Sequence, residues 1–108
     1  MRVLRAAGHF AVPDGEPNQY REHHRGADLS VGTYCIPVGG KDGQRPHTED
    51  EIYVVVRGRA RLQSDDGEVD VGPGAVIYVA AHEHHQFVEV SEDLSVVVVF
   101  GPAERSRA

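Results

Sequence analysis

Hydrophobic positions in this chain fall in short runs rich in valine, isoleucine and tyrosine, and glycine or proline separates one run from the next. No segment shows a sustained helical period of about 3.6 residues. The runs recur about every 8–12 residues with turn residues between them, a pattern typical of an all-β sandwich or barrel. The expected strands are 29–36, 51–57, 59–64, 68–71, 75–79, 84–90 and 94–100.

Glycine and aspartate mark the turns between these runs. Gly58 interrupts a β-branched run, which predicts a bulge or a turn. Asp66 and Gly67 form an Asp-Gly pair between two extended runs, which predicts a β-hairpin. The segment 37–43 contains three glycines and an aspartate, so we expect a loop there.

The two ends of the chain carry weaker signals. Residues 1–25 are expected to form an N-terminal strand, with 9–12 as its best candidate, and loops. His23 and His24 lie in a charged segment for which we expect a solvated turn. The tail 101–108 is polar and is expected to fray. With 108 residues, the chain is expected to be a single domain, 1–108, with its core at about 29–100.

Composition excludes several classes of partner. The chain has 17 acidic and 11 basic residues, a formal net charge of −6, and no basic stripe, so neither nucleic acid nor an anionic membrane is an expected partner. The longest apolar run, 96–100, is too short to span a bilayer. Cys35 is the only cysteine and cannot form an internal disulfide. These features favour a reducing, cytoplasmic location.

Seven histidines in so short a chain suggest metal chemistry, and His47 lies in the most informative stretch, 45–58. Glu51 follows His47 by four residues. On one straight strand their side chains would share a face but lie about 13 Å apart, too far to share an ion. The polar segment 48–50 could bend and bring them together, although spacing alone does not establish such a bend.

This stretch resembles the first motif of the cupin family, which reads glycine, five residues, His-x-His, three or four residues, glutamate, six residues, glycine. Gly39, His47, Glu51 and Gly58 match it, whereas Arg45 stands at the first histidine position. The second cupin motif reads glycine, five residues, Pro-x-Gly, two residues, histidine, three residues, asparagine.

The spacing of the second cupin motif is matched from Gly74 through His85 to Glu89. Ala80 and His82 replace the motif's proline and glycine, and Glu89 replaces its asparagine. The resemblance covers roughly residues 29–100.

The resemblance implies an RmlC-like jelly roll, also called a double-stranded β-helix, with two antiparallel sheets around a metal-containing cavity. The implied ligands are His47, Glu51 and His85, which would leave the opposite coordination positions of the ion open. Iron, zinc, nickel and manganese all accept such ligands. Gln44, Asp42 or water could fill the lost histidine position. The family also implies a homodimer, and the outward set Ile52, Val54 and Val56 would need cover.

Several residues admit two interpretations. Arg45 shares the inward phase of His47 if the strand continues through Pro46. Arg45, together with Gln44, is then a candidate to orient an anionic or enolic substrate. The alternative is a solvated arginine at the barrel mouth. Tyr53 and Phe87 share the inward phase and form either core or the apolar wall of the substrate pocket.

Three other residues have competing roles. Glu49 is either an alternative general base or part of a solvated face. His82 either lines the cavity or faces solvent from a loop. Cys35 is expected to be a small buried hydrophobe rather than a reactive thiol.

Two functions are compatible with this sequence. The first is a metal-dependent enzyme acting on a small molecule, of the dioxygenase, isomerase or lyase type, in which the metal serves as Lewis acid or oxygen activator. The second is a non-catalytic cupin that binds a small ligand or a metal. Fold similarity does not decide between them, because the scaffold hosts many functions.

Overall fold

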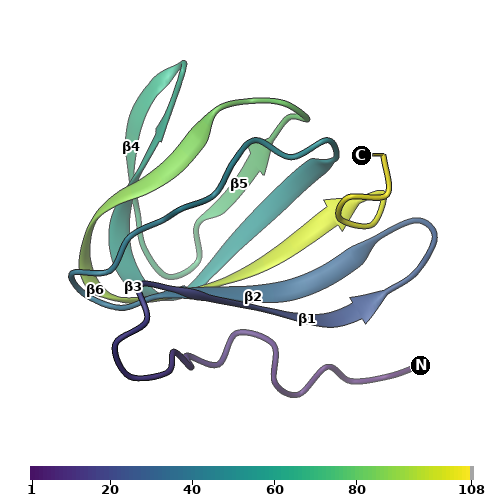
Figure 1. Cartoon of the computed structure of the whole chain (residues 1–108), viewed down its shortest axis with the longest axis horizontal. Coiled ribbons are helices and arrows are strands. Elements are labelled where there is room, and N and C mark those ends of the chain that lie inside the picture. Colours follow the sequence, from purple (N-terminus) through teal and green to yellow (C-terminus); the bar gives the residue numbers. More distant parts are fainter. Residues whose placement is uncertain (108) are drawn as a thin grey trace.

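The structure, a computed structural model, describes residues 1–107 and is all-β. Its strands are β1 (Gln19–Arg25), β2 (Ser30–Ile36), β3 (Asp50–Ser64), β4 (Gly67–Val71), β5 (Val76–Val79) and β6 (His85–Gly101). They pair antiparallel in the order β1-β2-β6-β3-β4, and β5 also pairs with β3 (Figure 1). No helix among the described residues is long and apolar enough to cross a membrane. The predicted all-β jelly roll is confirmed.

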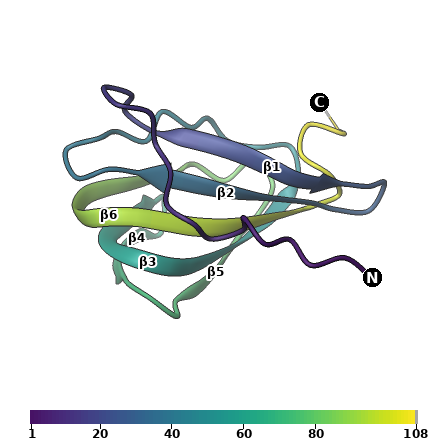
Figure 2. The same cartoon turned by 90° about the horizontal axis from the view of Figure 1, so that it is seen from below.

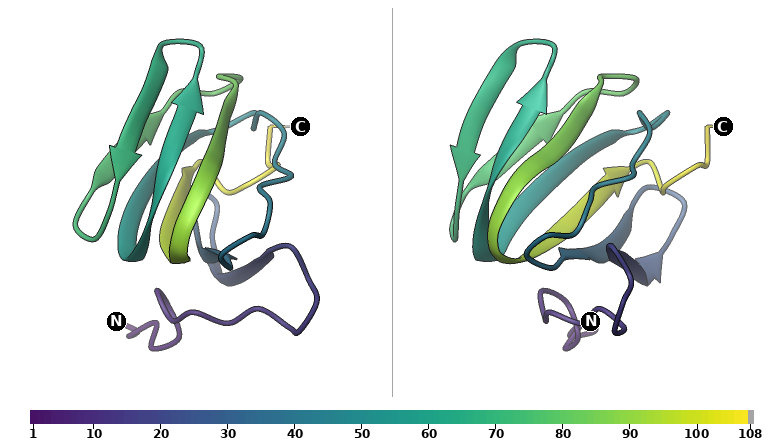
Figure 3. Two further views of the ribbon diagram at one scale, coloured as in Figure 1. Left: turned by 90° about the vertical axis from the view of Figure 1, so that its left-hand side faces the viewer. Right: turned by 60° about the vertical axis from the view of Figure 1, so that its left-hand side comes forward.

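Two long strands connect the layers of this fold. The runs predicted at 51–57 and 59–64 form the single strand β3, and those at 84–90 and 94–100 form the single strand β6. The β3–β6 pairing shifts register three times between residues 55 and 61, and the sheet curls on itself there (Figure 3). The expected pair of sheets is therefore one hydrogen-bonded sheet whose two longest strands belong to both layers.

Gly58 makes this bend possible. Its φ is +90°, and a Cβ at this position would lie 2.2 Å from the carbonyl oxygen of Asp93. The predicted bulge at Gly58 is confirmed. The predicted hairpin is confirmed as well, because Ser64 pairs with Gly67 across a two-residue turn.

The concave side of the curled sheet holds the core. Alternate residues of β3 and β6 point inward and meet side chains from β2. The largest of the fully buried apolar side chains are Tyr53, Phe100, Ile36, Leu94, Val55, Val96 and Val98. Cys35 is buried too, as expected, against the outer side of the sheet.

The N-terminal segment differs from the expectation. No strand forms at 9–12, and the strand of this region is β1, where a solvated turn was expected around His23 and His24. Residues 1–18 instead cross the outer face of the sheet, passing over β6 and β2 (Figure 2). Gly8 N donates to Thr33 Oγ1 at 2.9 Å, and Ser95 Oγ donates to Gly8 O at 2.6 Å. The charged, half-buried sequence of β1 conceals its strand character, because β1 is an edge strand.

Candidate metal centre

Three side chains from distant parts of the chain meet at one end of the fold. His47 lies near the end of the loop 37–49, Glu51 is the second residue of β3, and His85 is the first residue of β6. Residues 48 and 49 form the bend that the sequence allowed but did not establish. One ligand atom from each side chain lies within 4.8 Å of the others, and among the described residues this is the one group of potential metal ligands.

The three side chains are removed from water. Those of Glu51 and His85 are 1% exposed and that of His47 is 14% exposed. His85 Nε2 lies 2.9 Å and His47 Nδ1 3.6 Å from Glu51 Oε1. Even so, His47 Nδ1, His85 Nε2 and Glu51 Oε2 have no hydrogen-bond partner. Buried polar atoms without partners are costly, so their convergence on one point fits a bound cation.

Each histidine is oriented by a partner on its far side. His85 Nδ1 lies 2.8 Å from the carbonyl oxygen of Glu83, and His47 Nε2 lies 3.1 Å from Glu104 Oε2. Both partners are acceptors, so both of these nitrogens carry the proton. The lone pairs of the neutral rings, on His47 Nδ1 and His85 Nε2, are then directed at Glu51, which is the arrangement a metal ligand needs.

The cluster favours charged side chains when no metal is bound. Burial opposes charge on His47, but its contacts with Glu104 and Glu51 outweigh burial and raise the pKa of His47 to about 9. Burial likewise opposes charge on His85 and Glu51. The contact with Glu51 and the hydrogen bond to the Glu83 carbonyl nevertheless raise the pKa of His85. The contacts with His47 and His85 lower the pKa of Glu51. A cation that binds here therefore displaces protons from imidazole.

A buried carboxylate, Asp42, fixes the loop beside the cluster. It accepts hydrogen bonds from Tyr34 Oη at 2.8 Å, Phe87 N at 2.8 Å and Gln44 N at 3.0 Å. The Gln44 amide nitrogen lies 3.1 Å from Asp42 and 3.0 Å from the hydroxyl of Tyr53. Gln44, predicted as a weak fourth ligand or substrate-orienting group, is thus engaged with Asp42 and Tyr53.

An open pocket of about 610 Å³ lies beside His47. Its apolar wall comes from Tyr20, Tyr34, Val98 and Phe100. Tyr53 and Phe87, predicted as that wall, are 0% and 2% exposed and lie in the core. Their inward phase is confirmed, and because neither residue lines the pocket, both belong to the core rather than to the pocket wall.

Arg45 lies on the loop rather than on a strand, so the condition for its shared phase with His47, a strand continuing through Pro46, is not met. Both residues nevertheless line the pocket, where Arg45 is exposed at the rim. Arg105 lines the same pocket and is also exposed. The pocket thus carries two guanidinium groups, one predicted and one missed.

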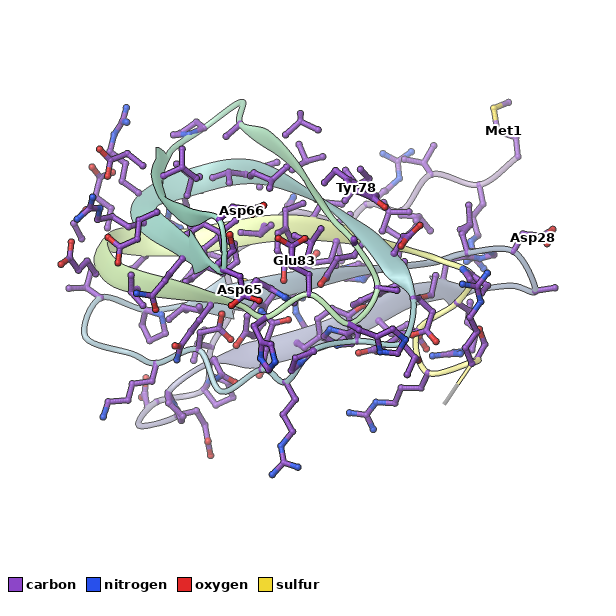
Figure 4. All side chains as sticks on the ribbon, turned by 90° about the horizontal axis from the view of Figure 1, so that it is seen from above. Met1, Asp28, Asp65, Asp66, Tyr78 and Glu83 are labelled. Atoms are coloured by element: carbon purple, nitrogen blue, oxygen red, sulfur yellow. The ribbon has the colours of Figure 1, made fainter. Side chains whose placement is uncertain are left out.

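Two smaller openings lie at His85. Asp65 and His84 line the second opening, and Asp66 and Glu83 line the third; the three acidic residues are labelled in Figure 4. Acidic residues therefore line both smaller openings, whereas the arginines line the larger pocket.

The structure also decides the expectations for Glu49 and His82: it contradicts both interpretations of Glu49 and agrees with the solvent-facing one of His82. Glu49 is neither a base facing the pocket nor solvated: it is 1% exposed and accepts hydrogen bonds from Arg105 N at 2.7 Å and Arg107 N at 2.9 Å. His82 is exposed on a loop, and its backbone N donates to His47 O at 2.7 Å.

Sequence reasoning missed Glu104, because it placed the residue in a fraying tail. The structure instead folds 102–107 back beside the beginning of β3 (Figure 1). No local pattern in the sequence marks this contact, since Glu104 is 57 positions from His47.

Comparisons with known proteins agree with this architecture. The family model of the cupin domain matches residues 32–100. The uncharacterized protein SCO3923 of Streptomyces coelicolor is 44% identical over 85 residues, covering 79% of this chain and 81% of that protein.

Solved structures show the same fold. A cupin superfamily protein from Desulfitobacterium hafniense superposes with a TM-score of 0.75 at 15% identity, covering 86% of this chain and 84% of its own. KdgF from Halomonas sp. superposes with a TM-score of 0.72 at 22% identity, covering 87% of this chain and 94% of its own.

Proposed function

The chain belongs to the cupin-domain family, and on that basis we propose that it is a metal-dependent enzyme acting on a small anionic or enolic molecule. The observation that carries the proposal is the convergence of buried ligand atoms of His47, Glu51 and His85 within 4.8 Å of one another. Two imidazoles and one carboxylate suit iron, zinc, nickel or manganese.

His47, Glu51 and His85 would hold the ion, and three protein ligands would leave coordination positions for water or substrate. A bound divalent metal would supply Lewis acidity, or oxygen activation if it is iron. Dioxygenase, isomerase and lyase chemistry all use such a centre. His47 connects it to the pocket, because His47 is the ligand that also lines the pocket wall.

The pocket supports an anionic substrate. Arg45 and Arg105 at its rim can each present a fork of N–H donors to a carboxylate or enolate. The apolar wall that includes Val98 and Phe100 would exclude water from the rest of the molecule. We assign Arg45 the role of orienting the acidic group, with the reacting carbon turned toward His47.

Metal binding is tested first. We expect alanine at each of the three ligand positions to lower the metal content per chain, measured by elemental analysis of protein purified without added metal. Full occupancy in all three variants would refute the site. Oxygen consumption with bound iron would support a dioxygenase, whereas zinc without oxygen uptake would support the isomerase or lyase type.

Substrate class is tested by a thermal-shift screen of small acids and matched neutral amides. A bound ligand stabilises by mass action, so acids should raise the Tm of the wild type, and Arg45→Gln should reduce that shift. Lys41→Gln, a change of an exposed cation outside the pocket lining, is the matched control. Equal shifts for acids and amides would contradict the anionic substrate. Acid-specific shifts without turnover would identify a binding module instead.

We also propose a cytoplasmic homodimer. A free buried thiol at Cys35 is compatible with a reducing compartment. Exposed apolar side chains remain on the outer face of β3 and β5, at Val56, Val76 and Tyr78.

A further inference from the structure

The C-terminal segment 102–107, here called the C-terminal hook, is fixed to the fold by several contacts. Ala103 is 2% exposed. Glu104 N donates to Ser30 Oγ at 2.9 Å, and Arg25 Nη2 donates to the carbonyl oxygen of Glu104 at 2.8 Å. These contacts connect the hook to β1 and β2, so the position of Glu104 is determined by the body of the protein.

Glu49 anchors the other half of the hook. Its carboxylate is buried and accepts the backbone N–H groups of Arg105 and Arg107, together with the hydroxyl of Thr48. Arg105 has a φ of +63°, in the left-handed region that side chains other than glycine rarely adopt. Such a conformation persists where the surroundings impose it, and here the buried Glu49 does so. Because Glu49 lies between His47 and Glu51, the hook is attached to the segment that carries two of the ligands.

The hook presents the side chain of Glu104 to the cluster of His47, Glu51 and His85. Glu104 Oε2 lies 3.1 Å from His47 Nε2, and the two side chains are 15% and 14% exposed. A carboxylate only accepts hydrogen bonds, so Nε2 is the protonated nitrogen of His47. The lone pair of the neutral ring is then on Nδ1, the atom that faces Glu51 and has no other partner.

We infer that Glu104 is a positioning residue of the metal site, and that the C-terminal hook serves to hold it there. Glu104 selects the His47 tautomer that coordinates through Nδ1 and fixes the orientation of the ring. The inference rests on the proposed metal binding by His47. His85 is positioned in a similar way: the Glu83 carbonyl accepts a hydrogen bond from Nδ1, so Nε2 is the nitrogen that can coordinate the ion.

The experiment measures Zn²⁺ affinity by competition with a chromophoric chelator, for the full chain. Loss of an outer partner of a metal-bound histidine weakens metal affinity by about 10–100-fold, and we expect this for Glu104→Ala. Glu104→Gln keeps an acceptor for Nε2–H and should recover part of the loss. Glu16→Gln, an exposed carboxylate outside the pocket lining, should match the wild type.

The His47 tautomer provides a readout that a purely structural role would not change. Long-range ¹H–¹⁵N correlation spectra of the zinc-loaded protein should show protonated Nε2 and coordinated Nδ1 in the wild type. Glu104→Ala should populate coordination through Nε2 or broaden the His47 signals. Unfolding curves of the metal-free variants identify any loss of folding.

The two proposals fail in different ways. If the wild type binds no zinc, or if His47→Ala binds it as well as the wild type does, the proposed site itself is refuted. If His47→Ala abolishes binding while Glu104→Ala keeps wild-type affinity and the same tautomer, only the role of Glu104 is refuted.

Discussion

Raising the pH should destabilise the metal-free protein through His47. The contacts of this histidine with Glu104 and Glu51 raise its pKa from 6.5 to about 9. A raised pKa means that the folded state binds the proton more tightly than the unfolded chain does. The resulting stability is fully present below pH 6.5 and is lost as the pH rises through about 9.

The size of this effect follows from the same two values. Since one pKa unit equals about 1.4 kcal/mol, the shift from 6.5 to about 9 corresponds to about 3 kcal/mol of unfolding free energy. About half of that should be lost between about pH 7.5 and pH 9. A typical domain has about 5–15 kcal/mol in total, so the change is large enough to measure.

The assay is urea unfolding in the presence of a chelator at a series of pH values. His47→Gln removes the titrating group and should give a flatter curve than the wild type over this range. His84→Gln, which changes an exposed histidine at the second opening, should keep the wild-type slope. Parallel curves for wild type and His47→Gln would refute the reasoning. With saturating zinc the trend should reverse, because a rising pH removes the protons that compete with the metal.

Four further substitutions test the fold and the assembly. His82 and Glu89 have φ of 67° and 49°, at positions where the cupin motif has glycine and asparagine. His82→Gly and Glu89→Asn should therefore each raise the free energy of unfolding by about 1 kcal/mol, measured by calorimetry. A lower Tm would contradict this. Gly58→Ala should cost at least about 2 kcal/mol in urea unfolding, because the new Cβ would approach the Asp93 carbonyl at a φ of +90°, and wild-type stability would show that the bend tolerates a side chain. Tyr78→Glu should convert the proposed homodimer to monomer in sedimentation equilibrium, whereas a monomeric wild type would refute the dimer.

Much of the fold could be predicted because the relevant signals are local. The period of two in β3, the Asp-Gly turn and the glycine at the bulge each depend on a few neighbouring residues. The continuity of β6 could not be predicted in the same way. Its polar middle, 91–93, lies between two of the expected strands, but pairing with the bulged part of β3 keeps it extended.

The residues of the candidate site that belong to the spaced motifs were predicted, whereas the residue that reaches the site through tertiary contacts was missed. His47, Glu51 and His85 follow from two spaced patterns, and the structure brings them together. Arg45 would share the phase of His47 only if a strand continued through Pro46, and the structure has a loop there. Glu104 had no pattern at all, because its role depends on a hydrogen bond to a residue 57 positions away.

The motif departures at His82 and Glu89 show what the family pattern specifies in this chain. Both residues keep the left-handed backbone that glycine and asparagine adopt most easily, although their side chains differ from the motif. His82 N donates to the carbonyl oxygen of His47, so the left-handed conformation at 82 shapes a loop that supports a ligand. Backbone conformation at position 82 is therefore tied to the geometry of the site. At both positions the left-handed conformation is kept although neither residue is the one that adopts it most easily.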